Sequence, residues 1–151
     1  MNPIDKIKFV DAIEPQAGAA IAGNWISLKN VLKVLVVVQI AQGAANTVAI
    51  TIEKAPLVDG ASNVAIDVVV PIWSNLDSAA SDDFVKRTNA VNYTTDAGVK
   101  NKIVVFEIDP SILGAGYAAI NVNTGASNAS NITSAHYLCE LRESGADLDA
   151  D

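Results

Sequence analysis

Apolar and polar residues alternate with a period of two in several segments of this sequence. In residues 47–54, Val48, Ile50 and Ile52 fall on one side of the chain and polar residues fall on the other. Side chains of a strand point alternately to its two faces, so this pattern predicts a strand with one buried face. Similar alternation predicts strands over residues 32–40, 64–72, 102–108, 117–122 and 134–142.

The alternation also predicts how some of these strands are covered. Segments 32–40 and 102–108 are apolar on both faces, so we expect both of their faces to be covered. Segment 64–72 turns Asp67 outward and places alternate apolar residues on the other face. The residues of this segment that we expect to be buried are Val64, Ile66, Val68, Val70 and Ile72.

Turn residues separate the predicted strands, and no long helical pattern lies between them. The strands recur about every 12 to 20 residues, and the chain contains 18 Val and 15 Ile but only 9 Leu. β-Branched side chains fit a pleated surface better than a helix. We therefore predict an all-β fold, an antiparallel β-sandwich of the jelly-roll type in a single domain.

The predicted sandwich domain covers residues 16–142. Residues 1–15 are predicted to form an extended N-terminal arm, which could add a strand to a neighbouring molecule. Residues 143–151 contain four acidic residues and one large apolar residue. A segment of this composition buries too little apolar surface to offset the entropy of ordering it, so we predict a flexible tail that is dispensable for folding.

Charge and hydropathy exclude several classes of partner. The formal net charge is −7, and Lys and Arg occur singly or in pairs, whereas a nucleic-acid-binding protein needs a basic face. The longest apolar run, residues 34–38, is far shorter than the ~20 residues that cross a bilayer as a helix. The start of the chain has no signal-peptide pattern. We expect no nucleic-acid or membrane partner and synthesis in the cytoplasm.

Three groups of residues could carry chemistry, and each has a simpler interpretation. Residues 114–119 match the G-x-G-x-x-A fingerprint of dinucleotide sites, but no helix pattern follows them, so we interpret them as a turn. His136 and Cys139 are three residues apart and point to opposite faces of one strand, so they cannot act as a nucleophile and its base. Asp77 and residues 81–83 could bind a divalent cation but match no known spacing. We predict a protein that is not an enzyme and holds no cofactor or metal.

The two tryptophans have different predicted roles. Trp25 precedes the long apolar strand and is predicted to anchor the core or its rim. Trp73 falls on the outward phase of its segment, as do Val69 and Pro71. We predict that Val69, Pro71 and Trp73 lie in an interface with another copy of the chain or with a larger assembly, since exposed aromatic residues are frequent in such contacts.

The order of these segments resembles a known family. The resemblance covers about residues 20–142, and it rests on Trp25–Asn30, Gly43–Ala55, Lys102–Ile108, Tyr117–Asn123 and Asn128–Ser130. In this order they are similar to the small capsid decoration, or cement, proteins of tailed phages. That family usually ends in a basic, aromatic segment, whereas this chain ends in acids, so a shared C-terminal contact is not expected.

The resemblance implies a virion structural protein on the capsid surface. Such a protein would bind the lattice of the major capsid protein, stabilise the head by mass action and form a homo-oligomer, either a dimer or a trimer. Two alternatives remain open from the residues. The chain could be a head–tail adaptor or tail component of a phage, or a carbohydrate-binding β-sandwich module.

Overall fold

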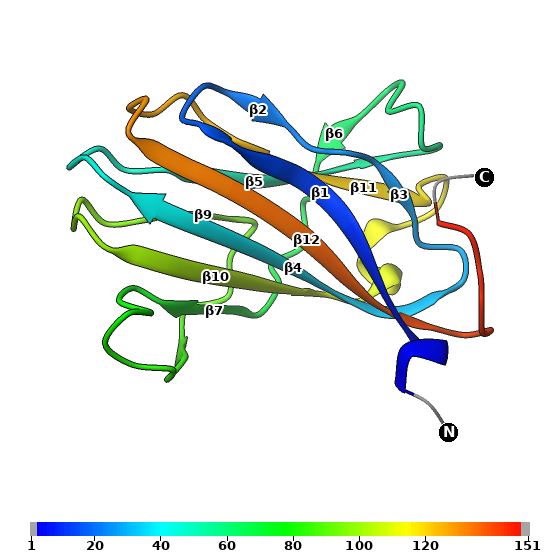
Figure 1. The fold of residues 1–151 in the computed structure, drawn as a ribbon. Coiled ribbons are helices and arrows are strands. Elements are labelled where there is room, and N and C mark those ends of the chain that lie inside the picture. Colours follow the sequence, from blue (N-terminus) through cyan, green and yellow to red (C-terminus); the bar gives the residue numbers. More distant parts are fainter. Residues whose placement is uncertain (1–2, 149–151) are drawn as a thin grey trace.

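In the computed structural model, which describes residues 3–148, the chain folds into two antiparallel sheets packed face to face (Figure 1). The strands are β1 (Ile7–Ala17), β2 (Ile21–Ala22), β3 (Ile26–Ser27), β4 (Val31–Gln42), β5 (Ala49–Ala55), β6 (Val64–Ala65), β7 (Ile72–Asn75), β8 (Val85–Lys86), β9 (Asn92–Thr94), β10 (Asn101–Ile108), β11 (Ala119–Thr124) and β12 (Asn131–Leu141). Two short 3₁₀ helices are η1 (Pro3–Asp5) and η2 (Pro110–Leu113). The prediction of an all-β antiparallel sandwich is confirmed.

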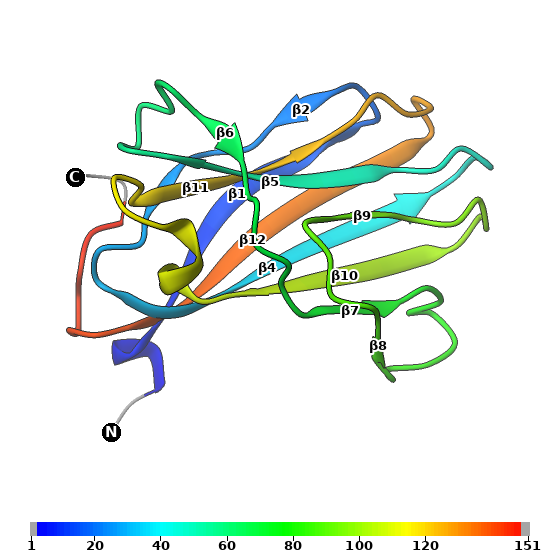
Figure 2. The same ribbon diagram turned by 180° about the vertical axis from the view of Figure 1, so that it is seen from behind.

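Each sheet contains six strands. The first sheet has the order β1-β12-β4-β10-β7-β8, and the second has the order β2-β11-β5-β6, with β3 also paired to β11 and β9 to β5. In Figure 1 the first sheet is nearer the viewer. In Figure 2, seen from the opposite side, the second sheet is nearer the viewer. Neighbours in the sheets are often distant in sequence, as with β1 and β12 at the two ends of the chain.

The core lies between the sheets and consists mainly of β-branched residues. Val34, Val36 and Val38 of β4 are fully buried, as are Ile50 and Ile52 of β5. Alternate residues of a strand share a face, so the period-two pattern of the sequence places these side chains inward. Burial of apolar surface is the main stabilising contribution to such a fold.

Tyr137 links the two sheets by hydrogen bonds across the core. Its hydroxyl accepts a hydrogen bond from the amide of Val122 in β11 over 3.0 Å and donates to the carbonyl of Asn24 over 2.8 Å. Asn24 lies in the gap between β2 and β3, the two short strands that pair with β11. The tyrosine therefore satisfies backbone groups at the break in that edge, and burial raises its pKa.

Lys102 is the centre of a polar cluster at one end of the sandwich. Its side chain is 0% exposed, and Nζ donates to Gln42 Oε1 at 3.0 Å, to the carbonyl of Asp96 at 2.9 Å and to Asp96 Oδ1 at 2.6 Å. Thr95 Oγ1 donates to Gln42 Oε1 over 3.1 Å. The cluster joins β4, β10 and the loop after β9, and its hydrogen bonds compensate the burial of a charge.

The N-terminal segment differs from the predicted arm. Residues Ile7–Ala17 form β1, which pairs along β12 and is an edge strand of the first sheet. Ala12 and Ile13 of this strand are buried in the core, and the ladder is interrupted by register shifts near Ile13. These inward apolar residues, together with a partner strand from the same chain, explain why the segment belongs to the sandwich. Residues 1–2 lie outside the described part.

The acidic C-terminal segment also differs from its prediction over residues 143–148. Leu148 is 1% exposed, and its carbonyl accepts a hydrogen bond from the amide of Ser27 over 2.8 Å. Lys8 Nζ donates to the carbonyl of Ala146 over 2.7 Å. The segment thus contacts both β1 and β3, because its single large apolar residue fills a site in the core. Residues 149–151 of the predicted tail lie outside the described part.

Segment 64–72 is not one continuous strand. Val64 and Ala65 form β6 in the second sheet, and the chain then crosses to the first sheet and begins β7 at Ile72. Ile66, Val70 and Ile72 are buried as expected, but Val64 and Val68 are each 43% exposed. A chain that changes sheets cannot keep one alternating face inward, and this accounts for the two exposed valines.

Candidate functional site

The side of the first sheet that faces away from the core is apolar. We call this surface the outer face and define it by Phe9, Leu35, Val37, Pro71, Trp73, Ile103, Val105 and Leu138. All of these residues are partly or largely exposed. In Figure 1 this side of the sheet faces the viewer, and no other described element crosses it.

The strand register places the outer-face residues in adjoining rows. One row joins Phe9, Leu138 and Leu35, which are successive register partners on β1, β12 and β4. The row continues through Glu107 to Pro71, since the amide of Glu107 donates to the carbonyl of Pro71 over 3.0 Å. Directly opposed side chains in neighbouring strands are in contact range, so Phe9, Leu138 and Leu35 form an apolar strip that Glu107 separates from Pro71.

A second row lies beside the first and crosses the whole sheet. Asp11 pairs with His136, His136 with Val37, and Val37 with Val105. The row continues from Val105 to Trp73 on β7 and from Trp73 to Lys86 on β8. Val37 on β4 and Val105 on β10 are the two central residues of this row, and Asp11 and Lys86 lie at its ends.

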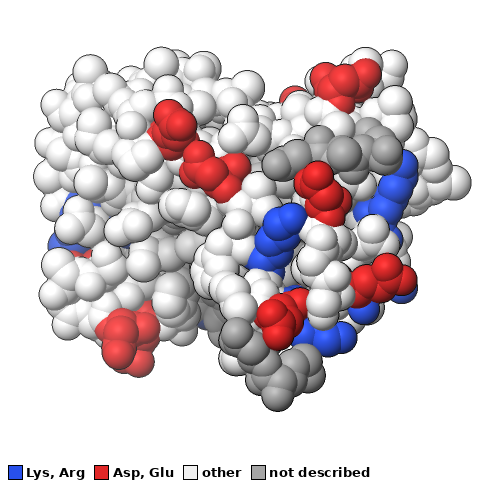
Figure 3. All heavy atoms as spheres, turned by 45° about the vertical axis from the view of Figure 1, so that its right-hand side comes forward, with Lys and Arg blue, Asp and Glu red and all other residues white. Residues whose placement is uncertain are grey.

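Several ionisable side chains around the outer face have a neighbour of the other type within the chain. Lys33 Nζ lies 2.6 Å from Glu107 Oε1, and His136 Nε2 lies 3.7 Å from Asp11 Oδ1. Hydrogen bonding to Glu107 raises the pKa of Lys33. Figure 3 shows this side of the molecule obliquely on its left, where few charged side chains are visible. The outer face therefore has little net charge in a chain whose formal charge is −7.

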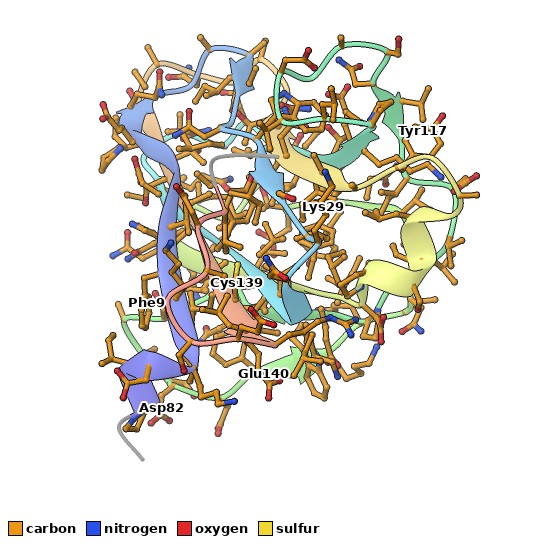
Figure 4. All side chains as sticks on the ribbon, turned by 90° about the vertical axis from the view of Figure 1, so that its right-hand side faces the viewer. Phe9, Lys29, Asp82, Tyr117, Cys139 and Glu140 are labelled. Atoms are coloured by element: carbon orange, nitrogen blue, oxygen red, sulfur yellow. The ribbon has the colours of Figure 1, made fainter. Side chains whose placement is uncertain are left out.

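A groove continues the outer face toward the start of β1. It has a volume of about 760 Å³ and is lined by Ile7, Leu32, Lys33, Leu35, Leu138 and Glu140, among others. Leu35 and Leu138 belong to both the groove and the outer face. Figure 4 shows Phe9 on the outer side of β1 beside this region, with Cys139 toward the interior. The groove and the outer face are therefore continuous through these two leucines, and the charged residues Lys33, Glu107 and Glu140 lie in the groove lining.

The outward side of the second sheet is polar by comparison. Its strands β5 and β11 turn Thr51, Glu53, Asn121 and Asn123 away from the core, and these residues are register partners. Asn121 and Asn123 hydrogen-bond each other. An antiparallel sheet with one solvated face has this alternation of buried apolar and outward polar residues. The outward side of the second sheet is therefore polar, with Thr51 exposed and Asn121 buried but hydrogen-bonded.

The structure separates the three residues predicted to form an interface. Trp73, 36% exposed, and Pro71 lie on the outer face, whereas Val69, 56% exposed, lies in the connection between β6 and β7. Lys86 Nζ lies 5.5 Å from the centre of the Trp73 ring, a distance at which a cation is attracted to an aromatic face. The sequence reasoning did not find Phe9, because it assigned residues 1–15 to an arm.

A second group of exposed apolar residues lies in segment 57–69, around β6. Its members are Leu57, Val64, Val68 and Val69. Two contacts hold the segment in place: Trp25 packs on Gly60, and Lys54 Nζ lies 2.7 Å from Asp67 Oδ1. Gly60 has a φ of +71°, and a Cβ there would lie 2.4 Å from Trp25 Nε1. Trp25 thus anchors the rim of the domain, as predicted.

The other candidate residues are arranged as structural elements. Burial raises the pKa of the Cys139 thiol to about 12, so the thiolate needed for a nucleophile is disfavoured. His136, three residues earlier on the same strand, is exposed on the opposite side. Gly114 and Gly116 have positive φ angles in a turn after η2, and β11 follows instead of a helix. Within residues 3–148, no three His, Cys, Asp or Glu side chains are grouped as metal ligands, and no helix is long and apolar enough to span a membrane.

The comparisons with known proteins identify the fold but no family. No family model matches the chain, and no curated protein matches it significantly. The structure is similar to the crystal structure of SPBc2 prophage-derived protein YomS, with a TM-score of 0.50. The match covers 89% of this chain and 93% of that chain at 7% sequence identity. At this identity the similarity shows that the two chains share a sandwich fold over nearly their whole lengths.

Proposed function

We propose that this chain is a virion structural protein that binds the outer capsid lattice of a tailed phage and stabilises the head. The observation that carries the proposal is the fold, which a prophage-derived protein shares over 93% of its length. The resemblance of residues 20–142 to decoration proteins points in the same direction. The chain is then a binding protein without catalytic activity, located on the capsid surface.

The distribution of apolar residues supports an assembly role. Two groups of exposed apolar side chains lie on a sheet face and on a loop segment anchored by Trp25 and Lys54. Enzyme and small-ligand sites instead bring a few polar groups together inside a concave pocket. A decoration protein needs only contacts that form on the assembled lattice, because binding to the assembled state alone shifts the equilibrium toward it.

We assign the lattice contact to segment 57–69. Leu57, Val64, Val68 and Val69 are between 43% and 56% exposed, and the fold itself does not require them to be apolar. Hydrogen bonding to Lys54 lowers the pKa of Asp67, which keeps this carboxylate charged and bound to Lys54 at neutral pH. A preorganised loop loses little entropy when it binds.

The proposal is tested on particles produced by the phage genome that encodes this chain. Electron cryomicroscopy of purified virions should show density for the chain at repeated positions on the head. Particles assembled without the chain should bind purified protein and become more resistant to heat. Location at the tail, or absence from the virion, contradicts the proposal.

The assigned contact is tested by substitution within segment 57–69. Val69→Asp should weaken binding to the undecorated particles at least about tenfold, because it places a charge in an apolar contact. Thr51→Asp is the matched control, since Thr51 is exposed on the polar side of the second sheet. If both variants bind as well as the unmodified chain, segment 57–69 is not the contact.

A further inference from the structure

We infer that the outer face is the interface of a symmetric homodimer, in which the first sheets of two copies pack face to face. The inference rests on this sheet alone and is independent of capsid binding. It identifies the occupant of the surface defined by Phe9, Leu35, Val37, Pro71, Trp73, Ile103, Val105 and Leu138 as a second copy of the chain.

The contrast between the two sheets indicates that the outer face is covered. β5 and β11 place polar residues such as Thr51 and Asn123 on their outward side, whereas β4 and β10 are apolar on both sides near their middle. Strands with two apolar faces are typical of sheets buried on both sides. Inside the chain only one side of β4 and β10 is covered, so the other side requires a partner.

The size of the outer face matches a dimer interface. Strands lie about 4.8 Å apart, and residues on one face repeat about every 6.8 Å along a strand. Five strands and three rows of outward residues therefore cover roughly 25 by 20 Å, or about 500 Å² in projection. The accessible area of a corrugated surface exceeds its projection, and a standard interface buries about 800 Å² on each partner.

The charge of the surface favours a second copy over an oppositely charged partner. Two chains of net charge −7 repel each other, and they can approach most closely through a face whose charges are already neutralised. On the outer face, Lys33 is paired with Glu107, and Asp11 lies beside His136. A strongly basic partner would find no excess of negative charge there.

The second row, from Asp11 to Lys86, is complementary to itself. Val37 lies near its middle, Asp11 at one end, and Trp73 and Lys86 at the other. A twofold axis parallel to β4 and passing beside Val37 exchanges the two ends of the row. Asp11 of each copy then approaches Trp73 and Lys86 of the other, while β4 packs on β4. An axis along the row would instead place Asp11 against Asp11.

Such a dimer keeps the proposed lattice contact accessible. β6 belongs to the second sheet, so segment 57–69 lies on the outside of each copy. The dimer would present this segment twice, which raises its apparent affinity for a repetitive surface.

Light scattering on the full chain tests the inference directly. We expect a mass of twice 15.7 kDa when the chain is studied at about tens of micromolar. Val37→Glu should raise the dimer dissociation constant at least about 100-fold, since each dimer would bury two unpaired charges. Thr51→Glu is the matched control on the second sheet and should leave the mass unchanged. Trp73→Asp, on a strand near the sheet edge, is a second disrupting variant in case Val37→Glu does not fold.

The direction of the twofold axis is tested by charge reversal. Asp11→Lys should weaken the dimer about fivefold at low salt, because each change acts twice in a symmetric interface. Adding Lys86→Asp should restore most of the loss. A monomeric wild-type chain, or a dimer that folded Val37→Glu and Trp73→Asp leave intact, overturns the inference. Equal affinity of the single and double charge variants overturns the axis. None of these outcomes depends on binding to a capsid.

Discussion

Replacing Lys102 by Met should destabilise the fold only moderately, whereas replacing it by Ala should be severe. Lys102 Nζ donates three hydrogen bonds from a side chain with no exposed surface. Each of the three acceptors has a second donor: Thr95 for Gln42 Oε1, Gln42 Nε2 for the Asp96 carbonyl, and the Gly98 amide for Asp96 Oδ1. Methionine therefore removes a buried charge without leaving a buried acceptor unpaired.

The magnitudes follow from what each substitution removes. Loss of the charged hydrogen bonds, offset by the lower cost of burying an apolar group, should reduce the free energy of unfolding by about 1–2 kcal/mol in Lys102→Met. Lys102→Ala also removes the aliphatic stem and leaves a cavity, which adds about 2–5 kcal/mol. The corresponding drop in Tm is about 2–4 °C for each kcal/mol in a domain of this size.

Equilibrium urea unfolding followed by circular dichroism measures these differences. Lys100→Met is the matched control, because Lys100 is exposed and solvent screens its pair with Asp77, so its loss should change the free energy of unfolding little. If Lys102→Met unfolds at the same urea concentration as Lys100→Met, the cluster does not stabilise the fold. If Lys102→Met and Lys102→Ala lower the free energy of unfolding equally, the packing role assigned to the aliphatic stem of Lys102 is contradicted.

The pH dependence provides a second measurement on the same variants. Hydrogen bonding to Lys102 is the largest cause that lowers the pKa of Asp96 in the folded chain. A carboxyl group with a depressed pKa stabilises the fold above its unfolded pKa, and this stabilisation is lost as the pH falls through the folded pKa. The difference in free energy of unfolding between the wild type and Lys102→Met should therefore become smaller below pH about 4, the ordinary pKa range of Asp.

Three further substitutions test other parts of the fold. Thr124→Val should raise the free energy of unfolding by about 1 kcal/mol, measured by urea unfolding, because Thr124 Oγ1 is a buried hydroxyl without a hydrogen-bond partner among the described residues. Tyr137→Phe should lower it by about 2–3 kcal/mol, since it leaves the buried amide of Val122 unpaired; an unchanged urea midpoint would contradict this role. Leu148→Ala should lower the free energy of unfolding by about 2 kcal/mol, which lowers Tm by several degrees. Leu57→Ala is the control at an exposed position and should change Tm by less than about 2 °C.

Local patterns in the sequence determined the class of fold. Alternation of apolar and polar residues depends only on the two-residue repeat of a strand, so it correctly predicted β4, β5, β10, β11 and β12. It also predicted that Trp73 points outward and that Cys139 points inward. The two-sided apolar character of residues 32–40 and 102–108 predicted that both faces are covered; within the chain one face is covered, and the other forms the partly exposed outer face.

Only the tertiary structure decided which segments lie beside one another. The partner of β1 is β12, more than a hundred residues away. No local pattern encodes such a pairing, so residues 7–15 of this strand were assigned to an arm. Leu148 is the one large apolar residue of an acidic segment. It is buried because strands distant in sequence form the part of the core that it joins. The outer face likewise exists because Phe9, Leu138, Leu35 and Val105 come from four strands that are adjacent in space. The repeat within a strand is a local property, whereas register and sheet order are set by long-range packing.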